Sequence, residues 1–185
     1  MTSSQAHRTP AEAPPRRPRS RGGPAAEEFE GVYRRHYPAV QRYLRRRVGD
    51  AHAVEDLAAE TFLVAYRHYA RWEDRGLPIR AWLYRLATSR LHRWLRRGGR
   101  RRTQALEAEP YAAEPEDGAR RESARRALLA LPARLQSALA LHYLEGLSVE
   151  AVAGVLGCRP GTVKSRLHRG RRALRRELER RGFEA

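Results

Sequence analysis

Several residue types that organise other proteins are almost missing from this chain of 185 residues. Cys158 is the only cysteine, so no disulfide can form within the chain, which is compatible with a reducing cytoplasm. No run of about 18 apolar residues occurs, and we therefore expect no direct membrane insertion. The N-terminal segment has arginines but no apolar stretch, so we do not expect a secretory signal.

Lysine is nearly absent as well, because Lys164 is the only one among 38 basic residues. The formal net charge is +17, which makes a polyanion the expected partner. We favour nucleic acid over a membrane surface because the arginines cluster on helices that also need an apolar face for packing. A well-solvated surface encoded by GC-rich DNA is the alternative explanation for much of the arginine.

The sequence also lacks the side-chain arrangements that catalysis and metal binding require. The seven histidines are scattered, and no phosphate-binding glycine loop or nucleophile elbow occurs. Asp56 and Glu60 lie one helical turn apart and could share a metal ion, but no third ligand is evident nearby. We therefore expect no enzyme activity, no cofactor and no small-molecule substrate.

Helical periodicity dominates the rest of the chain, and no strand-like alternation occurs. Apolar residues recur at helical spacing over residues 25–97 and again over 119–181, which predicts an all-α fold of two small helical domains. Pro38 is expected to break the first segment into two helices, and Asp50 to cap the helix that follows.

Three segments without periodicity mark the domain boundaries. Residues 1–24 mix proline, arginine, serine and glycine, which predicts a disordered tail. Residues 98–118 begin with two glycines and become acidic and proline-containing, which predicts a flexible acidic linker. Residues 182–185 form a C-terminal tail. With such a linker, we expect the relative placement of the two domains not to be fixed in the free chain.

Residues 148–181 have the pattern of a helix-turn-helix. Ser148 is a plausible N-cap, Gly157 suits the turn, and Pro160 suits the first turn of the second helix. An apolar stripe on that helix faces a core and consists of Val163, Leu167, Leu174 and Leu178. The polar face is rich in hydrogen-bond donors for base edges and phosphates and carries Lys164, Ser165, His168 and Arg169.

Two further surfaces in the first domain stand out. Glu55, Asp56 and Glu60 lie away from the apolar stripe of their helix, and they form either a functional acidic patch or an ordinary solvated face. After the loop at residues 71–79, arginine, aromatic and hydroxyl side chains lie together and could stack on unpaired bases. Trp82 taken alone would more often be a core residue.

Two separated segments resemble one family in the same order. The sequence EDLAAETFLVAYR at residues 55–67, followed by PIRAWLYRLATSRLHRWLRR at residues 78–97, resembles conserved region two of bacterial sigma-70 family factors. Residues 131–174, which contain GTVKSR, resemble region four. The lack of an N-terminal inhibitory domain and of a globular region three points to the extracytoplasmic-function (ECF) group.

This resemblance implies three functional surfaces and several partners. Docking on the clamp helices of the largest subunit of core RNA polymerase would involve Glu55, Asp56, Glu60 and Phe62. Recognition and melting of the minus-ten promoter element would involve Arg80, Trp82, Arg85, Ser89 and Arg93. Recognition of the minus-thirty-five element would involve Thr162, Lys164, Ser165, His168 and Arg169. The flap of the second-largest subunit and an anti-sigma factor would be further partners.

Ser89 and Arg93 depart from the pattern of the family, whose members often carry Asn, and Asn or Asp, at these positions. An autonomous helix-turn-helix activator or repressor is the alternative interpretation, but it explains only the C-terminal half of the chain. A nucleic-acid-processing enzyme lacks any catalytic arrangement in the sequence.

Overall fold

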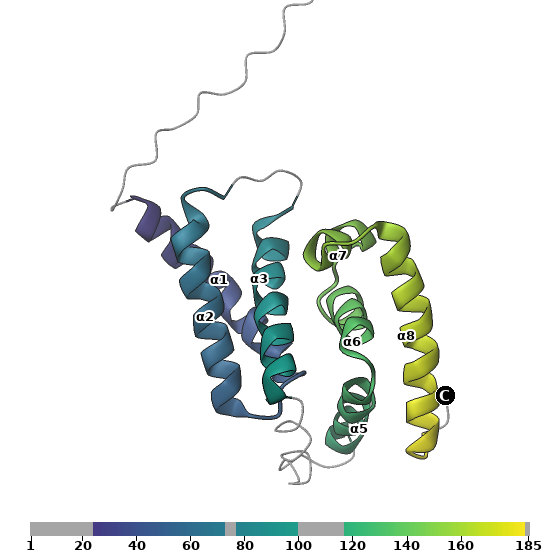
Figure 1. Cartoon of the computed structure of the whole chain (residues 1–185). Helices are drawn as coiled ribbons and strands as arrows, with labels where there is room; N and C mark the ends of the chain where they lie inside the picture. The colour runs from purple at the N-terminus through teal and green to yellow at the C-terminus, as the bar shows by residue number, and fades with distance from the viewer. Residues whose placement is uncertain (1–23, 73–76, 100–116, 184–185) are drawn as a thin grey trace, which may run out of the picture.

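The computed structural model describes residues 24–72, 77–99 and 117–183, and these form helices joined by turns, with no strand among them. The expected N-terminal tail and most of the expected linker lie outside the described residues. In chain order the helices are α1 (Pro24–Arg45), α2 (Ala51–Tyr69), α3 (Ile79–Trp94), η1 (Leu95–Gly99), α5 (Asp117–Ala130), α6 (Ala133–Leu139), η2 (Ala140–Leu144), α7 (Val149–Leu156) and α8 (Pro160–Arg180). They form two groups, α1 to α3 and α5 to α8 (Figure 1), so the predicted all-α fold with two helical domains is confirmed.

The first domain packs α1 and α3 against α2. Asp50 caps α2 as predicted, since its Oδ1 accepts a hydrogen bond from the Ala53 amide at 3.2 Å. The predicted break at Pro38 is wrong, because α1 runs through it without interruption. Pro38 lies on the exposed side of α1, where water can bind the carbonyl that loses its donor.

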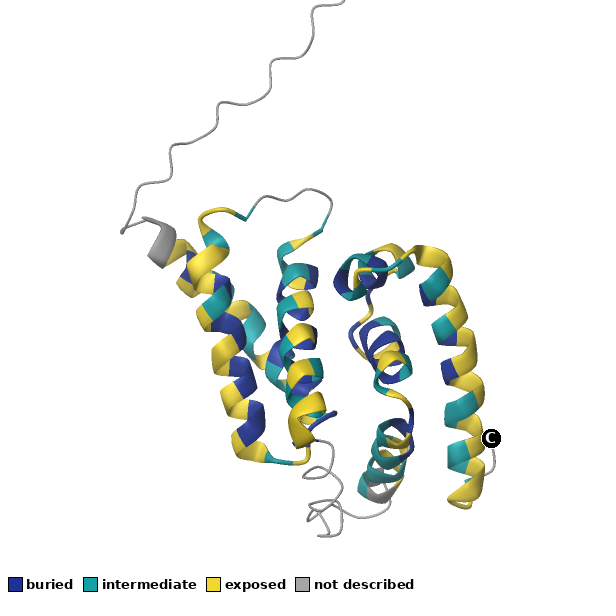
Figure 2. Ribbon diagram, in the orientation of Figure 1, coloured by how far each residue is buried: buried dark blue, intermediate teal, exposed yellow. Residues whose placement is uncertain are grey.

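The core of the first domain comes from one apolar stripe on each helix (Figure 2). The buried residues of α2 are Ala53, Val54, Leu57, Ala58, Thr61, Phe62 and Ala65, which include every residue of the predicted stripe. They pack against buried side chains such as Leu44 on α1 and Leu83 on α3. Each fully buried side chain of this size stabilises the fold by about 1.5–3 kcal/mol relative to an exposed one.

The second domain contains the predicted helix-turn-helix, formed by α7 and α8. Ser148 Oγ accepts a hydrogen bond from the Ala151 amide at 3.1 Å, and Gly157 ends α7 in the left-handed conformation with φ 60°. Val163 and Leu167 of α8 are buried. At Gly170, α8 approaches α6 so closely that an added Cβ would lie 3.0 Å from Leu139 Cγ.

The two domains pack against each other, with α3 of the first beside α7 of the second (Figure 1). Buried apolar residues from both domains join one continuous core. This differs from the expectation that the domains have no fixed relative placement. The composition of a linker predicts the behaviour of the linker alone, and it carries no information on whether the two surfaces that it joins fit each other.

Within residues 24–72, 77–99 and 117–183, no helix combines the length and the apolar character needed to cross a bilayer.

Candidate partner-binding and nucleic-acid surfaces

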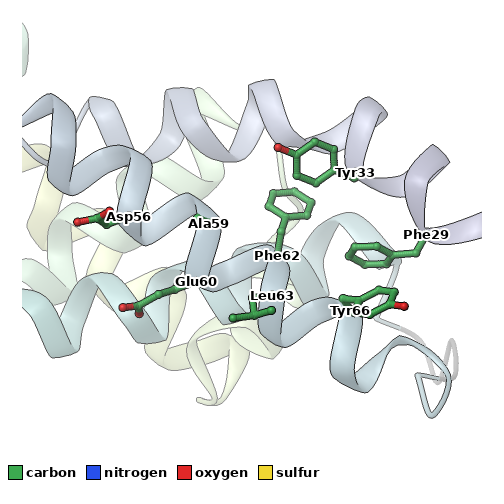
Figure 3. Close-up of a pocket in the computed structure, with 8 residues that line it drawn as sticks. All are labelled: Phe29, Tyr33, Asp56, Ala59, Glu60, Phe62, Leu63 and Tyr66. Carbon is green, nitrogen blue, oxygen red and sulfur yellow. The ribbon is translucent and has the colours of Figure 1, made fainter. Parts of the chain in front are cut away.

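The acidic patch of α2 is exposed, and it borders an apolar groove. Glu55, Asp56 and Glu60 all point to solvent. The groove lies between α1 and α2 and is lined by Phe29, Tyr33, Asp56, Ala59, Glu60, Phe62, Leu63 and Tyr66. Figure 3 shows the two carboxylates at one end of the groove and the aromatic rings at the other. An amphipathic partner with basic and apolar side chains fits this arrangement.

Phe62 has a different place from the other predicted docking residues, since only 3% of its surface is exposed. Its ring centroid lies 5.0 Å from that of Tyr33 and 5.5 Å from that of Tyr37. Phe62 therefore forms part of the floor of the groove and supports the more exposed rings above it. Burial raises the pKa of Tyr37, and the neighbouring Tyr33 and Glu55 add to this rise, so its hydroxyl stays protonated.

The exposed apolar side chains of the groove were missed in the sequence. Leu63 and Tyr66 are 50% and 52% exposed, and Tyr33 of α1 is 41% exposed. A signal was present for one of them, because Leu63 follows Asp56 by seven residues and Glu60 by three, and so continues the acidic face of α2. Large exposed apolar side chains gathered at one groove indicate a protein-binding surface.

On α3, the structure brings together three of the five residues predicted to contact the minus-ten element. Arg85, Ser89 and Arg93 are exposed at four-residue spacing and form one polar stripe. Trp82 is half-buried at the start of the helix, with its ring centroid 6.1 Å from that of Trp72. Trp72 was missed, although an aromatic residue in the predicted loop was a signal for it.

Arg80 lies apart from that stripe, at the contact between the two domains. Its Nη2 donates a hydrogen bond to the main-chain carbonyl of Glu145 and lies 3.8 Å from the Glu145 carboxylate. The same carboxylate accepts hydrogen bonds from Arg46 Nη1 at 3.1 Å and from the Tyr84 hydroxyl. Burial and the bond to Glu145 raise the pKa of Tyr84, so its hydroxyl acts as a donor. No pattern in the sequence indicates this role for Glu145.

A second polar cluster joins the domains next to the helical core. His92 Nε2 lies 2.8 Å from Ser137 Oγ, and Arg47 Nη2 donates to the Ala133 carbonyl at 3.5 Å. Burial, together with the surrounding arginines, lowers the pKa of His92 to about 4, so the imidazole is neutral at pH 7. The arginines that face His92 are Arg47, Arg96, Arg134 and Arg166.

The second domain presents its predicted recognition residues on the outer side of α8. Lys164, Ser165, His168 and Arg169 are exposed, while Thr162 is half-buried near the start of the helix. The basic surface continues toward the C-terminal end of α8 with exposed Arg171, Arg172, Arg175 and Arg176. A helix with one buried stripe and an exposed polar, basic face has the form needed to enter a major groove.

Among the described residues, no group of three or more His, Cys, Asp or Glu side chains is placed to hold a metal ion. Asp56 and Glu60 remain neighbours on the same face of α2 at the edge of the groove.

Two family models match the chain, in the order predicted from the sequence. Residues 32–101 match sigma-70 region 2, and residues 121–174 match sigma-70 region 4. The first range covers the acidic face and α3, and the second covers the helix-turn-helix. The residues predicted for all three candidate surfaces therefore fall inside the matched regions.

Sigma factors from several bacteria are similar in sequence. The ECF RNA polymerase sigma factor SigL of Mycobacterium tuberculosis is 34% identical, over 85% of this chain and 94% of SigL. RNA polymerase sigma factor YlaC of Bacillus subtilis is 31% identical, over 82% of this chain and 92% of YlaC. SigE of Mycolicibacterium smegmatis is 34% identical, but the chain spans only 62% of its length. These relatives belong to a class of transcription factors and are not enzymes.

Two solved structures share the fold. CnrH, in complex with the cytosolic domain of CnrY, has 26% identity and a TM-score of 0.64, over 83% of this chain and 89% of CnrH. The sigma factor RpoE of Bartonella quintana, in complex with the anti-sigma factor NepR, has 24% identity and a TM-score of 0.68, over 83% of this chain and 98% of RpoE.

Proposed function

Because the chain belongs to the ECF group of the sigma-70 family of RNA polymerase sigma factors, we propose that it binds core RNA polymerase and directs initiation at two-element promoters. The observation that carries this proposal is the pairing of two surfaces in one chain. One is an acidic and apolar groove suited to a protein, and the other is a basic recognition helix suited to duplex DNA.

Polymerase docking is assigned to the groove of the first domain. Asp56 and Glu60 supply the charge, and the exposed Leu63 and Tyr66 supply apolar contact area beside them. The clamp helices of the largest subunit are the proposed partner, with a basic and apolar side turned toward the groove. The carboxylates would favour correct orientation and rapid association, while the apolar side chains would supply most of the binding free energy.

The two DNA elements are assigned to different helices. On α8, Lys164, Ser165, His168 and Arg169 would enter the major groove of the minus-thirty-five element, with Thr162 near the helix start. On α3, Arg85, Ser89 and Arg93 would contact the separated strands of the minus-ten element, and the ring pair of Trp72 and Trp82 would offer a stacking surface.

An anti-sigma factor is a further proposed partner, since RpoE forms a complex with the anti-sigma factor NepR, and CnrH forms one with the cytosolic domain of CnrY. The site of action would be the cytoplasm, where core polymerase and promoter DNA are found. The alternative, an autonomous helix-turn-helix regulator, has less support because it does not explain why residues 32–101 match sigma-70 region 2.

The test is reconstitution with purified core polymerase and a promoter template. The chain should bind core enzyme and direct specific run-off transcription. The double variant Asp56→Ala, Glu60→Ala should bind core enzyme at least about tenfold more weakly, because it removes the charge from the groove. Glu150→Ala, Glu179→Ala is the matched control, since it removes the same charge from exposed positions of the second domain. Equal loss in both variants, or no loss in the first, would contradict the docking assignment.

A further inference from the structure

The side chain of Glu145 is a carboxylate of the second domain whose hydrogen-bond partners come from the first. It follows η2 and is only 7% exposed. Arg46, directly after α1, and Tyr84 on α3 donate to its carboxylate, and Arg80 on α3 binds its main-chain carbonyl. A buried carboxylate is costly unless it is paired, and here the pairing is possible only when the two domains touch.

The side chains that bind Glu145, two arginines and a tyrosine, are of the kinds that also bind phosphate groups. Arginine side chains bind planar and tetrahedral oxyanions through several N–H groups, and a tyrosyl hydroxyl adds a further donor. Arg46 and Arg80 are each less than half exposed in this contact, with 43% and 45% of their side-chain surface accessible. The chain has a net charge of +17, and the Glu145 carboxylate is an anion that the chain itself supplies to these donors. It lies against the face of α3 that adjoins the polar stripe proposed to bind single strands.

The rest of the contact contains a feature that opposes closure. Arg47 is 1% exposed, and its hydrogen-bond acceptors among the described residues are neutral, the Tyr43 hydroxyl at 2.7 Å and the Ala133 carbonyl at 3.5 Å, while its guanidinium also lies over the Tyr43 ring. Within the described residues its Nε has no hydrogen-bond partner. A buried, incompletely satisfied cation destabilises the closed arrangement, so the ion pairs of Glu145 must offset this cost. Because the favourable ion pairs of Glu145 are partly offset by the buried Arg47, an anion that competes with Glu145 can open the contact between the domains.

We propose that Glu145 acts as an internal substitute for a DNA phosphate, which holds the two domains closed and keeps Arg46 and Arg80 from single-stranded DNA. The proposal rests on the function proposed above for α3. A strand that reaches α3 would compete with Glu145 for the same donors, and its binding would separate the domains. The recognition residues of α8 stay exposed in the closed form, so the block acts on single strands and leaves duplex recognition free.

The first experiment measures domain closure without DNA. Donor and acceptor dyes are attached at His52→Cys on α2 and Arg176→Cys on α8, both exposed positions, in a Cys158→Ser background. The otherwise unchanged protein should show high energy transfer. Glu145→Ala should lower it, with the ratio of open to closed molecules rising about tenfold or more, as expected when a buried ion pair loses one member. Glu150→Ala, an exposed acid on α7, is the control for charge and should leave the transfer unchanged.

The second experiment titrates the same proteins with a short single-stranded oligodeoxynucleotide. Glu145→Ala should bind it about tenfold more tightly than the Glu150→Ala control, and the oligonucleotide should lower energy transfer in the unchanged protein. Tyr84→Phe keeps the packing volume and both arginines, so it should open the domains in part even if Glu145→Ala folds poorly. Circular dichroism of each variant checks that the helices are intact.

Two results would overturn the proposal: equal energy transfer in Glu145→Ala, Tyr84→Phe and the control, or opening without any gain in oligonucleotide binding. Failure of the proposed function gives a different pattern. In that case, the unchanged protein would not support transcription with core polymerase, while Glu145→Ala would still open the domains and strengthen oligonucleotide binding.

Discussion

Leu77 of the first domain packs on Gly154 of the second so closely that an added Cβ at position 154 would lie 2.9 Å from Leu77 Cδ1. Gly154 lies within α7, where a glycine without such a neighbour would only weaken the helix. The small residue therefore serves the contact between the domains. Replacing Gly154 by a larger residue should therefore strengthen the helix α7 while it weakens the contact between the domains.

Gly154→Gln should open the domains while keeping the second domain folded. The longer side chain collides with Leu77, whereas its helix propensity exceeds that of glycine by roughly 0.5–1 kcal/mol. Small-angle X-ray scattering should show a larger radius of gyration, with helix content unchanged. Gly31→Gln is the control, because an added Cβ there meets nothing within 4 Å. An unchanged radius in Gly154→Gln would mean that Leu77 moves aside without loss of contact.

The contact between the domains should weaken in acid through His92. Its pKa is lowered from 6.5 to about 4, so the closed form favours the neutral imidazole. This contribution is complete above pH 6.5 and is lost as the pH falls toward 4, because the open form then takes up a proton that the closed form resists. Energy transfer between the two dye sites should decrease over this range.

His92→Gln is the control for the acid response, since glutamine can keep a hydrogen bond to Ser137 and does not titrate there. Burial and Arg35 also lower the pKa of His36, which gives an effect of the same sign. His36 is present in both proteins, so the difference between them reports His92 alone. Identical pH profiles would exclude His92 as the group responsible.

The apolar part of the groove should matter to polymerase binding as much as its charge. Leu63→Ala and Tyr66→Ala remove exposed side chains, so the fold should be retained. Each change should weaken binding to core polymerase by about 1–3 kcal/mol, in the range of buried apolar anchors at interfaces. His68→Ala changes an exposed residue of α2 outside the groove and should have no effect. Fluorescence anisotropy of labelled protein against core enzyme measures the difference.

Arg169→Ala should weaken binding at the upstream promoter element by about 1–3 kcal/mol, because it removes a base or phosphate contact. The side chain is exposed and its Nε donates to the Ser165 carbonyl at a long 3.4 Å, so the helix does not depend on it. The affinity of the holoenzyme for promoter and for scrambled duplexes distinguishes a base contact from a phosphate contact. A loss confined to the promoter indicates base contact, and an equal loss on both indicates a phosphate contact.

The elements that could be predicted from sequence are those governed by local rules. Asp50, Ser148 and Gly157 mark helix ends because a cap depends on a few neighbouring residues. The apolar stripes of α2 and α8 follow from periodicity in the same way. The break predicted at Pro38 was wrong because water can bind the carbonyl that an exposed proline leaves unpaired, and the local sequence does not show whether a proline is exposed.

The features that were missed depend on contacts between residues far apart in the chain. No role was predicted for Glu145, and nothing near it in the sequence indicates that Arg46 and Tyr84 lie within hydrogen-bond distance. Arg80 was grouped with the other residues of α3 for the same reason. Phe62 was assigned to docking by its place in a motif, and only the packing of Tyr33 and Tyr37 around it shows that it supports the groove from below.

The exposed position of Lys164 on α8 has a practical consequence, since the chain contains no other lysine. Any modification of a lysine side chain in this chain therefore falls on the recognition helix. Acetylation would remove the charge of Lys164 and would thereby alter one side chain of the DNA-reading face. The extent of its modification, followed by mass spectrometry, is a direct measure of how much of that face is occupied.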